Sequence, residues 1–127
     1  MKLGNQKENK FLSSKSVAVI GSPTCSGQSK KGTELGPEAI RKTDLFDKIT
    51  EAGWHIFDDG DIDLSGAPTS SNPTVHGMKR SSECGYASQQ LHKKLVPHLQ
   101  AGRFVLNLGG DHSTACGSIS AVLKVSF

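Results

Sequence analysis

Apolar residues along the chain form short continuous runs that are separated by longer segments of mixed character. Val17-Ala18-Val19-Ile20 is such a run, and it ends at Gly21 and Pro23. A short β-branched run bounded by turn residues is typical of a strand that is buried on both faces of a parallel sheet. Three strands are predicted, near residues 16–21, 54–58 and 103–108.

Between these runs, apolar residues recur at the three- and four-residue spacing of helices that bury one face. Gly36-Pro37 marks the start of the first helix, because proline at the first helical position lacks an N–H that would have no partner there. Gly53 is expected to end that helix, and Pro97 is expected to kink or end the second one. The predicted helices lie near residues 37–52, 81–100 and 113–124.

The order of these elements predicts an α/β fold with one central parallel sheet flanked by helices. Strands and helices alternate, and parallel strands need crossover connections of this length. A chain of 127 residues is the size of one domain. We expect a flexible N-terminus over residues 1–15, one domain over residues 16–127, and a surface loop over residues 65–80.

Composition excludes several classes of protein. Hydrophobic residues are 35% and charged residues 21%, which is a globular balance, and the net charge of +3 comes from scattered rather than clustered basic residues. Nucleic-acid binding is therefore not expected. No apolar stretch is long enough to span a membrane, and the first fifteen residues lack the apolar core of a signal peptide. With three cysteines, an odd and sparse count, these features predict a cytoplasmic protein.

In open α/β sheets, ligands bind beyond the carboxyl ends of the strands, and three segments are predicted to lie there. The acidic segment 58–63 lacks the glycine and the closing glutamate of a calcium-binding EF-hand loop, so it is interpreted as a solvated strand end. Segment 21–27 opens a glycine-containing loop that contains neither a dinucleotide fingerprint nor a P-loop. It is interpreted as a turn into a helix, with a small nucleotide-binding protein kept as an alternative.

The third segment, Gly109-Gly110-Asp111-His112-Ser113, carries the strongest chemical signal. Two glycines after a buried strand allow the backbone to turn sharply and approach another group closely. A carboxylate and an imidazole follow directly, and together they suit a divalent ion such as Mn or Zn. The alternative is a turn in which Asp111 caps the next helix by accepting a backbone N–H.

Three segments of the chain together resemble the arginase and agmatinase superfamily of ureohydrolases. The segment SVAVIGSPTCSGQSKKGTELGPEAIRK resembles the first strand, Ser-x-Gly-Gln loop and first helix of arginases. DDGDIDL is similar to the end of their second strand, and LNLGGDHSTACGSIS to their first metal-ligand motif. The similarity runs from about Ser16 to Ser120, and the Ser-Gly-Gln loop favours arginase over agmatinase.

The resemblance implies a three-layer arginase-like fold and the hydrolysis of L-arginine to L-ornithine and urea, as in arginine metabolism and the urea cycle. Family members use two Mn²⁺ ions that share a bridging hydroxide, since metal-bound water ionises near neutral pH. By this resemblance His112 is the first metal ligand, and Asp111 supports it from behind without ligating. The family also forms oligomers, so a homo-oligomer is expected, with no nucleic-acid or membrane partner.

The family has two further motifs after this one, Asp-Ala-His-x-Asp and a later Asp-x-Asp, and neither occurs in the residues that follow His112. The resemblance therefore implies a truncated arginase, limited to about the first three strand–helix units and inactive alone. No residue of the family's acid–base or substrate-binding groups is assigned to this chain. The alternatives are a non-catalytic fragment that associates with full-length subunits, and a fragment of an agmatinase-type enzyme.

Overall fold

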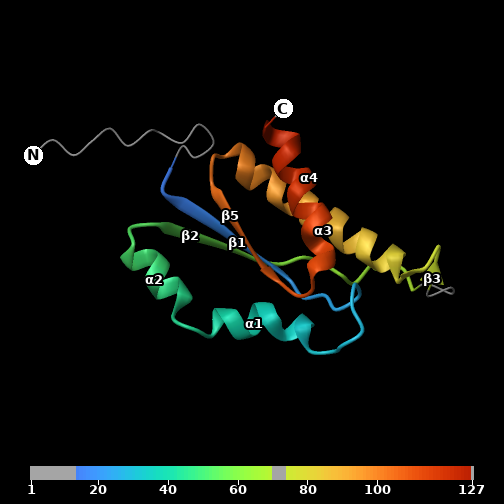
Figure 1. The fold of residues 1–127 in the computed structure, drawn as a ribbon. Helices are drawn as coiled ribbons and strands as arrows, with labels where there is room; N and C mark the ends of the chain where they lie inside the picture. The colour runs from blue at the N-terminus through green and yellow to red at the C-terminus, as the bar shows by residue number, and fades with distance from the viewer. Residues whose placement is uncertain (1–13, 70–73, 127) are drawn as a thin grey trace, which may run out of the picture.

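The computed structural model describes residues 14–69 and 74–126 and contains a three-stranded parallel sheet (Figure 1). Its strands are β1 (Ser16–Ser22), β2 (His55–Asp61) and β5 (Phe104–Gly109), in the order β2-β1-β5. Val19 of β1 pairs in parallel with Asp58 on one side and with Leu106 on the other. The predicted parallel α/β fold is confirmed, and β1 is buried along its whole length because it is the central strand.

Helices cover both faces of this sheet and make three layers (Figure 1). On one face lie α1 (Gly36–Arg41), which follows the 3₁₀ turn Thr33–Leu35, and α2 (Leu45–Glu51); on the other lie α3 (Ser81–Gln100) and α4 (Ala115–Ser126), the latter preceded by the 3₁₀ turn His112–Thr114. Alternate residues of β1 serve the two cores. Val17 and Val19 pack with the first helix pair, and Ala18 and Ile20 pack with the second.

The first predicted helix, near residues 37–52, was expected as one piece, and it is broken between α1 and α2. Thr43 explains the break. Its hydroxyl donates to the Ile40 carbonyl over 2.7 Å, and the same oxygen accepts from the Leu45 backbone N–H over 3.3 Å. A threonine side chain that bonds its own backbone competes with the helical ladder and ends it locally.

Two other predictions differ from the structure. Strand β2 runs three residues past the predicted end at residue 58, to Asp61. Helix α3 has the predicted range 81–100, and it continues through Pro97 to Gln100. The predicted loop over residues 65–80 contains a short antiparallel pair, β3 (Thr74–Val75) with β4 (Met78–Lys79), joined through two residues with positive φ.

Most of the expected flexible segment 1–15 lies outside the described residues. Within the described ranges, no helix is both long and apolar enough to cross a bilayer.

Helices α3 and α4 pack together at Gly117. A Cβ atom at this position would lie 2.4 Å from the Ser88 carbonyl oxygen and 3.0 Å from its Cα. Both neighbours are backbone atoms of α3, so they cannot rotate away. The glycine therefore sets the distance between the two helices that cover one face of the sheet.

This contact predicts that Gly117→Ala destabilises the protein by about 1–3 kcal/mol, the usual cost of overpacking, although alanine is intrinsically the better helix former. Gly85→Ala is the matched control. Position 85 lies on α3 with open space where a Cβ would stand, so this change should stabilise by about 1 kcal/mol. Urea denaturation of both variants measures the difference, and two changes of the same sign would contradict the packing argument.

Candidate metal site at the carboxyl ends of the strands

The loop after β5 and the loop after β1 interlock at the carboxyl edge of the sheet. Gly110 crosses directly over the second loop, where a Cβ atom would lie 2.3 Å from the Ser22 carbonyl oxygen and 2.6 Å from that of Thr24. The next residue, Asp111, donates its backbone N–H to the Thr24 carbonyl over 3.0 Å. Only glycine fits this crossing, which explains one of the two glycines that sequence analysis singled out.

Asp111 joins the two loops through its side chain as well. One carboxylate oxygen accepts the Ser113 backbone N–H over 2.8 Å and caps the 3₁₀ turn that leads into α4. The other accepts the Gly27 backbone N–H, also over 2.8 Å, from the loop after β1. Burial raises the pKa of Asp111, but hydrogen bonds from Ser113 and Gly27 and the nearby charge of Arg80 outweigh it, so the pKa lies below its usual range.

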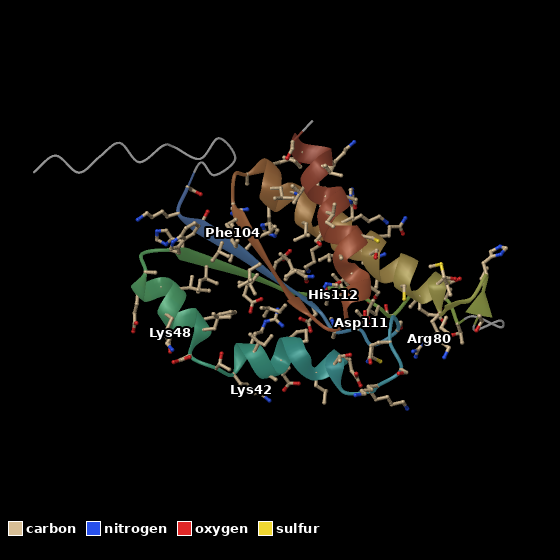
Figure 2. The ribbon with its side chains drawn as sticks, in the orientation of Figure 1. Lys42, Lys48, Arg80, Phe104, Asp111 and His112 are labelled. Carbon is tan, nitrogen blue, oxygen red and sulfur yellow. The ribbon has the colours of Figure 1, made fainter. Side chains whose placement is uncertain are left out.

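His112 follows Asp111 and is exposed, in contrast to its buried neighbour. It borders an open hollow of about 260 Å³ that is also lined by Asn107, Thr114 and Ser118. Figure 2 shows Asp111 and His112 together between the end of β5 and the start of α4. Among the residues that the structure describes, no three His, Cys, Asp or Glu side chains are close enough to hold a metal ion.

Gly27 in the loop after β1 and Gly36 at the start of α1 both pack against this region. A Cβ atom at Gly27 would lie 2.5 Å from the Ser113 Cβ, and one at Gly36 would lie 2.6 Å from the Gly109 carbonyl oxygen. These positions, together with Gly21 and Gly32, suggested a nucleotide-binding loop as an alternative. Gly27 and Gly36 instead make room for the Asp111 loop.

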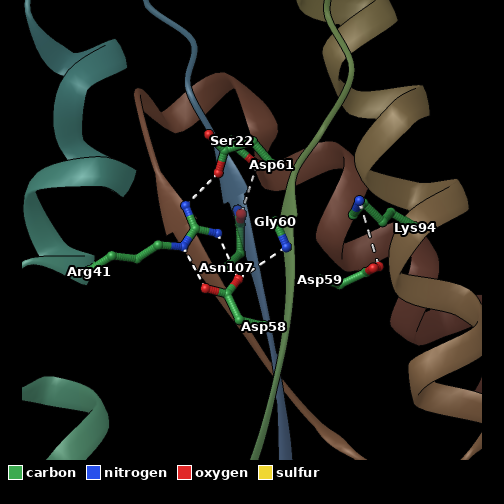
Figure 3. A network of polar contacts seen from close by, with 8 residues as sticks. All are labelled: Ser22, Arg41, Asp58, Asp59, Gly60, Asp61, Lys94 and Asn107. Atoms are coloured by element: carbon green, nitrogen blue, oxygen red, sulfur yellow. Dashed lines mark hydrogen bonds and ion pairs between the residues drawn. The ribbon is translucent and has the colours of Figure 1, made fainter.

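A second polar cluster lies on the α1 side of β2 (Figure 3). Arg41 binds Asp58 through two hydrogen bonds, Nε to Oδ2 over 2.9 Å and Nη2 to Oδ1 over 3.0 Å, and its Nη1 binds Asp61 Oδ1 over 2.5 Å. Burial raises the pKa of Asp58, but the bonds from Arg41 and from the Gly60 N–H bring it below its usual range. Asp58 and Asp61 are exposed, as predicted for a solvated strand end, and the structure adds that both are bound to Arg41.

A β-bulge explains how both carboxylates reach one arginine. Val19 pairs with Asp58 and Gly21 with Asp61, so β2 contains one more residue than β1 over this stretch. In a regular strand residues three apart point to opposite faces, and the extra residue puts them on the same face. Gly60 takes the required positive φ of 70°. Asp59 points to the other face, where its Oδ2 lies 3.6 Å from Lys94 Nζ (Figure 3).

The site thus contains both predicted residues and several that sequence analysis missed. His112 and Asp111 lie at the carboxyl end of β5, as expected. The partners of Asp111, which are Gly27 and Thr24, and the ion pair of Arg41 with Asp58 were not identified. The available signal for Gly27 was the Ser26-Gly27-Gln28 segment, since a glycine within a loop can mark a close approach of two backbones.

Comparison with known proteins identifies the family. The Arginase family profile matches residues 15–126. The chain is 36% identical to the arginase of Staphylococcus aureus over 114 residues and 38% identical to arginase-1 of Homo sapiens over 112 residues. These matches cover 87% and 88% of this chain but 37% and 34% of the relatives. The chain therefore spans about a third of the length of the curated relatives it matches.

Solved structures agree with this result. The arginase of Bacillus caldovelox superposes with a TM-score of 0.75 at 30% identity, over 85% of this chain and 36% of that one. The arginase of Bacillus cereus superposes with a TM-score of 0.73 at 33% identity, over 86% and 35%. The family profile, the sequence similarity and the fold agree, and the chain belongs to the arginase family.

Proposed function

We propose that this chain is part of an arginase-type ureohydrolase that hydrolyses L-arginine to L-ornithine and urea with two manganese ions. The observation that carries the proposal is the place of His112, exposed at a hollow beyond the carboxyl end of β5 in a chain of the arginase family. Ligand sites of parallel α/β sheets lie at this edge. An imidazole nitrogen is also a suitable ligand for a divalent transition metal.

In this proposal His112 is a metal ligand and Asp111 supports it. The Asp111 carboxylate accepts the Gly27 and Ser113 backbone N–H groups, each over 2.8 Å, so it ties the loop after β1 to the turn before α4 at the edge of the hollow. Such a support fixes the backbone from which the ligand projects. Asp111 therefore combines the two interpretations that the sequence left open, since it caps a helical turn and serves the proposed site.

The described residues do not by themselves fit a pair of metal ions. They offer one exposed imidazole at the hollow, whereas a protein metal site needs several ligands. We therefore propose that the 127 residues alone do not release urea from arginine. Homo-oligomer formation and a cytoplasmic location belong to the same proposal, as family expectations.

The role of Asp111 predicts a loss of stability on Asp111→Ala of about 2 kcal/mol, because the helical turn loses its cap and the Gly27 N–H loses its acceptor. The folded-state pKa of Asp111 lies below the unfolded value, so its contribution is present above the usual aspartate range and is lost as the pH falls through the folded pKa. Urea denaturation at neutral and acid pH should show a gap between wild type and variant that narrows in acid. A gap independent of pH would contradict this assignment.

A single ligand predicts weak manganese binding. No stoichiometric Mn²⁺ should remain on the chain after desalting, because closed sites draw on several groups at once. In solution, added Mn²⁺ should broaden the NMR signals of His112 and its neighbours, and His112→Ala should remove that broadening. His76→Asn is the control, since His76 is exposed and asparagine tolerates its positive φ of 49°. Tight binding that is lost on His112→Ala would show that the chain holds further ligands.

The activity itself is tested by exchange of segments. Residues 15–126 are placed into the arginase of Bacillus caldovelox in exchange for the matched segment, and urea release is measured with L-arginine and with agmatine. We expect Mn-dependent release from L-arginine in the chimera and none from the isolated chain. His112→Asn in the chimera should lower the rate by more than about 100-fold, beyond the usual effect of a group that only supports a ligand, and His76→Asn should leave it unchanged. A chimera that releases no urea, or turnover by the isolated chain, would contradict the proposal.

A further inference from the structure

Arg80 has a backbone conformation that is unfavourable for arginine, which raises the question of what its side chain contributes. It precedes α3 with φ 50° and ψ 39°, in the left-handed region, and its side chain makes no cap to the helix. Residues other than glycine, asparagine and aspartate rarely adopt this conformation, because it strains their backbone. Glycine would fit this position without strain, so the backbone alone does not favour arginine here.

The guanidinium of Arg80 contacts the loop after β1 instead. Its Nη2 donates to the Gln28 carbonyl oxygen, 52 residues earlier in the chain. Its positive charge also favours the ionised form of the Asp111 carboxylate. Figure 2 shows Arg80 near the start of α3 and Asp111 near the start of α4, both close to the loop that follows β1.

Asp111 holds the neighbouring residue of the same loop. The Gly27 N–H donates to Asp111 over 2.8 Å, and the carbonyl of the next residue, Gln28, accepts from Arg80. Two adjacent residues of the loop are therefore fixed by side chains from two different helix starts. Asp111 is in turn the residue directly before His112, so the loop position and the histidine position are coupled.

We propose that Arg80 is a positioning residue for the His112 site: by holding the Gln28 carbonyl it keeps the Gly27 N–H on Asp111, which fixes the backbone that carries His112. The coupling between Arg80 and Gly27 stands on the hydrogen bonds alone. Its significance for a metal ligand rests on the proposed function.

The test uses Arg80→Gly, which removes the side chain and relieves the strained backbone together. Hydrogen exchange of the Gly27 amide is measured by NMR on the full chain, beside the melting temperature. We expect the melting temperature to stay level or rise, while exchange at Gly27 becomes about tenfold faster, the loss expected for one charge-assisted hydrogen bond. Arg80→Lys keeps one donor and should restore part of the protection. Lys79→Ala, at the exposed neighbouring position, should change neither quantity.

A purely structural role for Arg80 gives a different result. In that case Arg80→Gly would leave Gly27 exchange unchanged or accelerate exchange at all amides in step with a lower melting temperature, and either outcome overturns the inference. Manganese broadening of the His112 signals separates the two proposals. If Arg80→Gly frees the Gly27 amide but Mn²⁺ broadens His112 in neither protein, the positioning role stands and the proposed metal site fails.

Discussion

The carboxylate of Asp111 is the interaction on which the arrangement of the candidate site depends. This carboxylate joins the loop after β5 to Gly27 in the loop after β1, 84 residues earlier in the sequence. Gly110 lets the two backbones approach, but it contributes no attraction. The Gly27 N–H donates to the Asp111 carboxylate and the Asp111 N–H donates to the Thr24 carbonyl, and these two bonds hold the loops together. The first is charge-assisted and therefore stronger than a neutral hydrogen bond.

The sheet supports this crossing by dividing its side chains between two faces. Val17 and Val19 anchor the layer of α1 and α2, and Ala18 and Ile20 anchor the layer of α3 and α4. Polar groups follow the same division at the carboxyl edge, where Arg41 and Lys94 meet neighbouring aspartates from opposite sides (Figure 3). These ion pairs tie the carboxyl end of β2 to α1 on one face and to α3 on the other.

The elements that could be predicted from the sequence are those that local patterns determine. The apolar run Val17–Ile20 identified the central strand, and Gly36-Pro37 identified a helix start, because each depends on adjacent residues. The break at Thr43 was missed, because the spacing of apolar residues over this stretch also fits a continuous helix. Only the structure shows that the Thr43 hydroxyl bonds the Ile40 carbonyl. The bulge at Gly60 was missed for a similar reason, because it exists only in the register with β1.

The candidate site was predicted in part for the same reason. The motif around His112 is contiguous and could be recognised, whereas the partners of Asp111 come from a loop 84 residues earlier and Arg80 from a third segment.

The separation of Gly27 from Asp111 in the sequence also affects the order in which the contacts form during folding. Closing so long a loop costs conformational entropy before any contact repays it, so contacts of this kind tend to form late in folding. During synthesis the loop after β1 emerges long before residue 111, and until then the Gly27 N–H lacks the Asp111 carboxylate. The geometry nearest the proposed chemistry must therefore wait until residue 111 has been made.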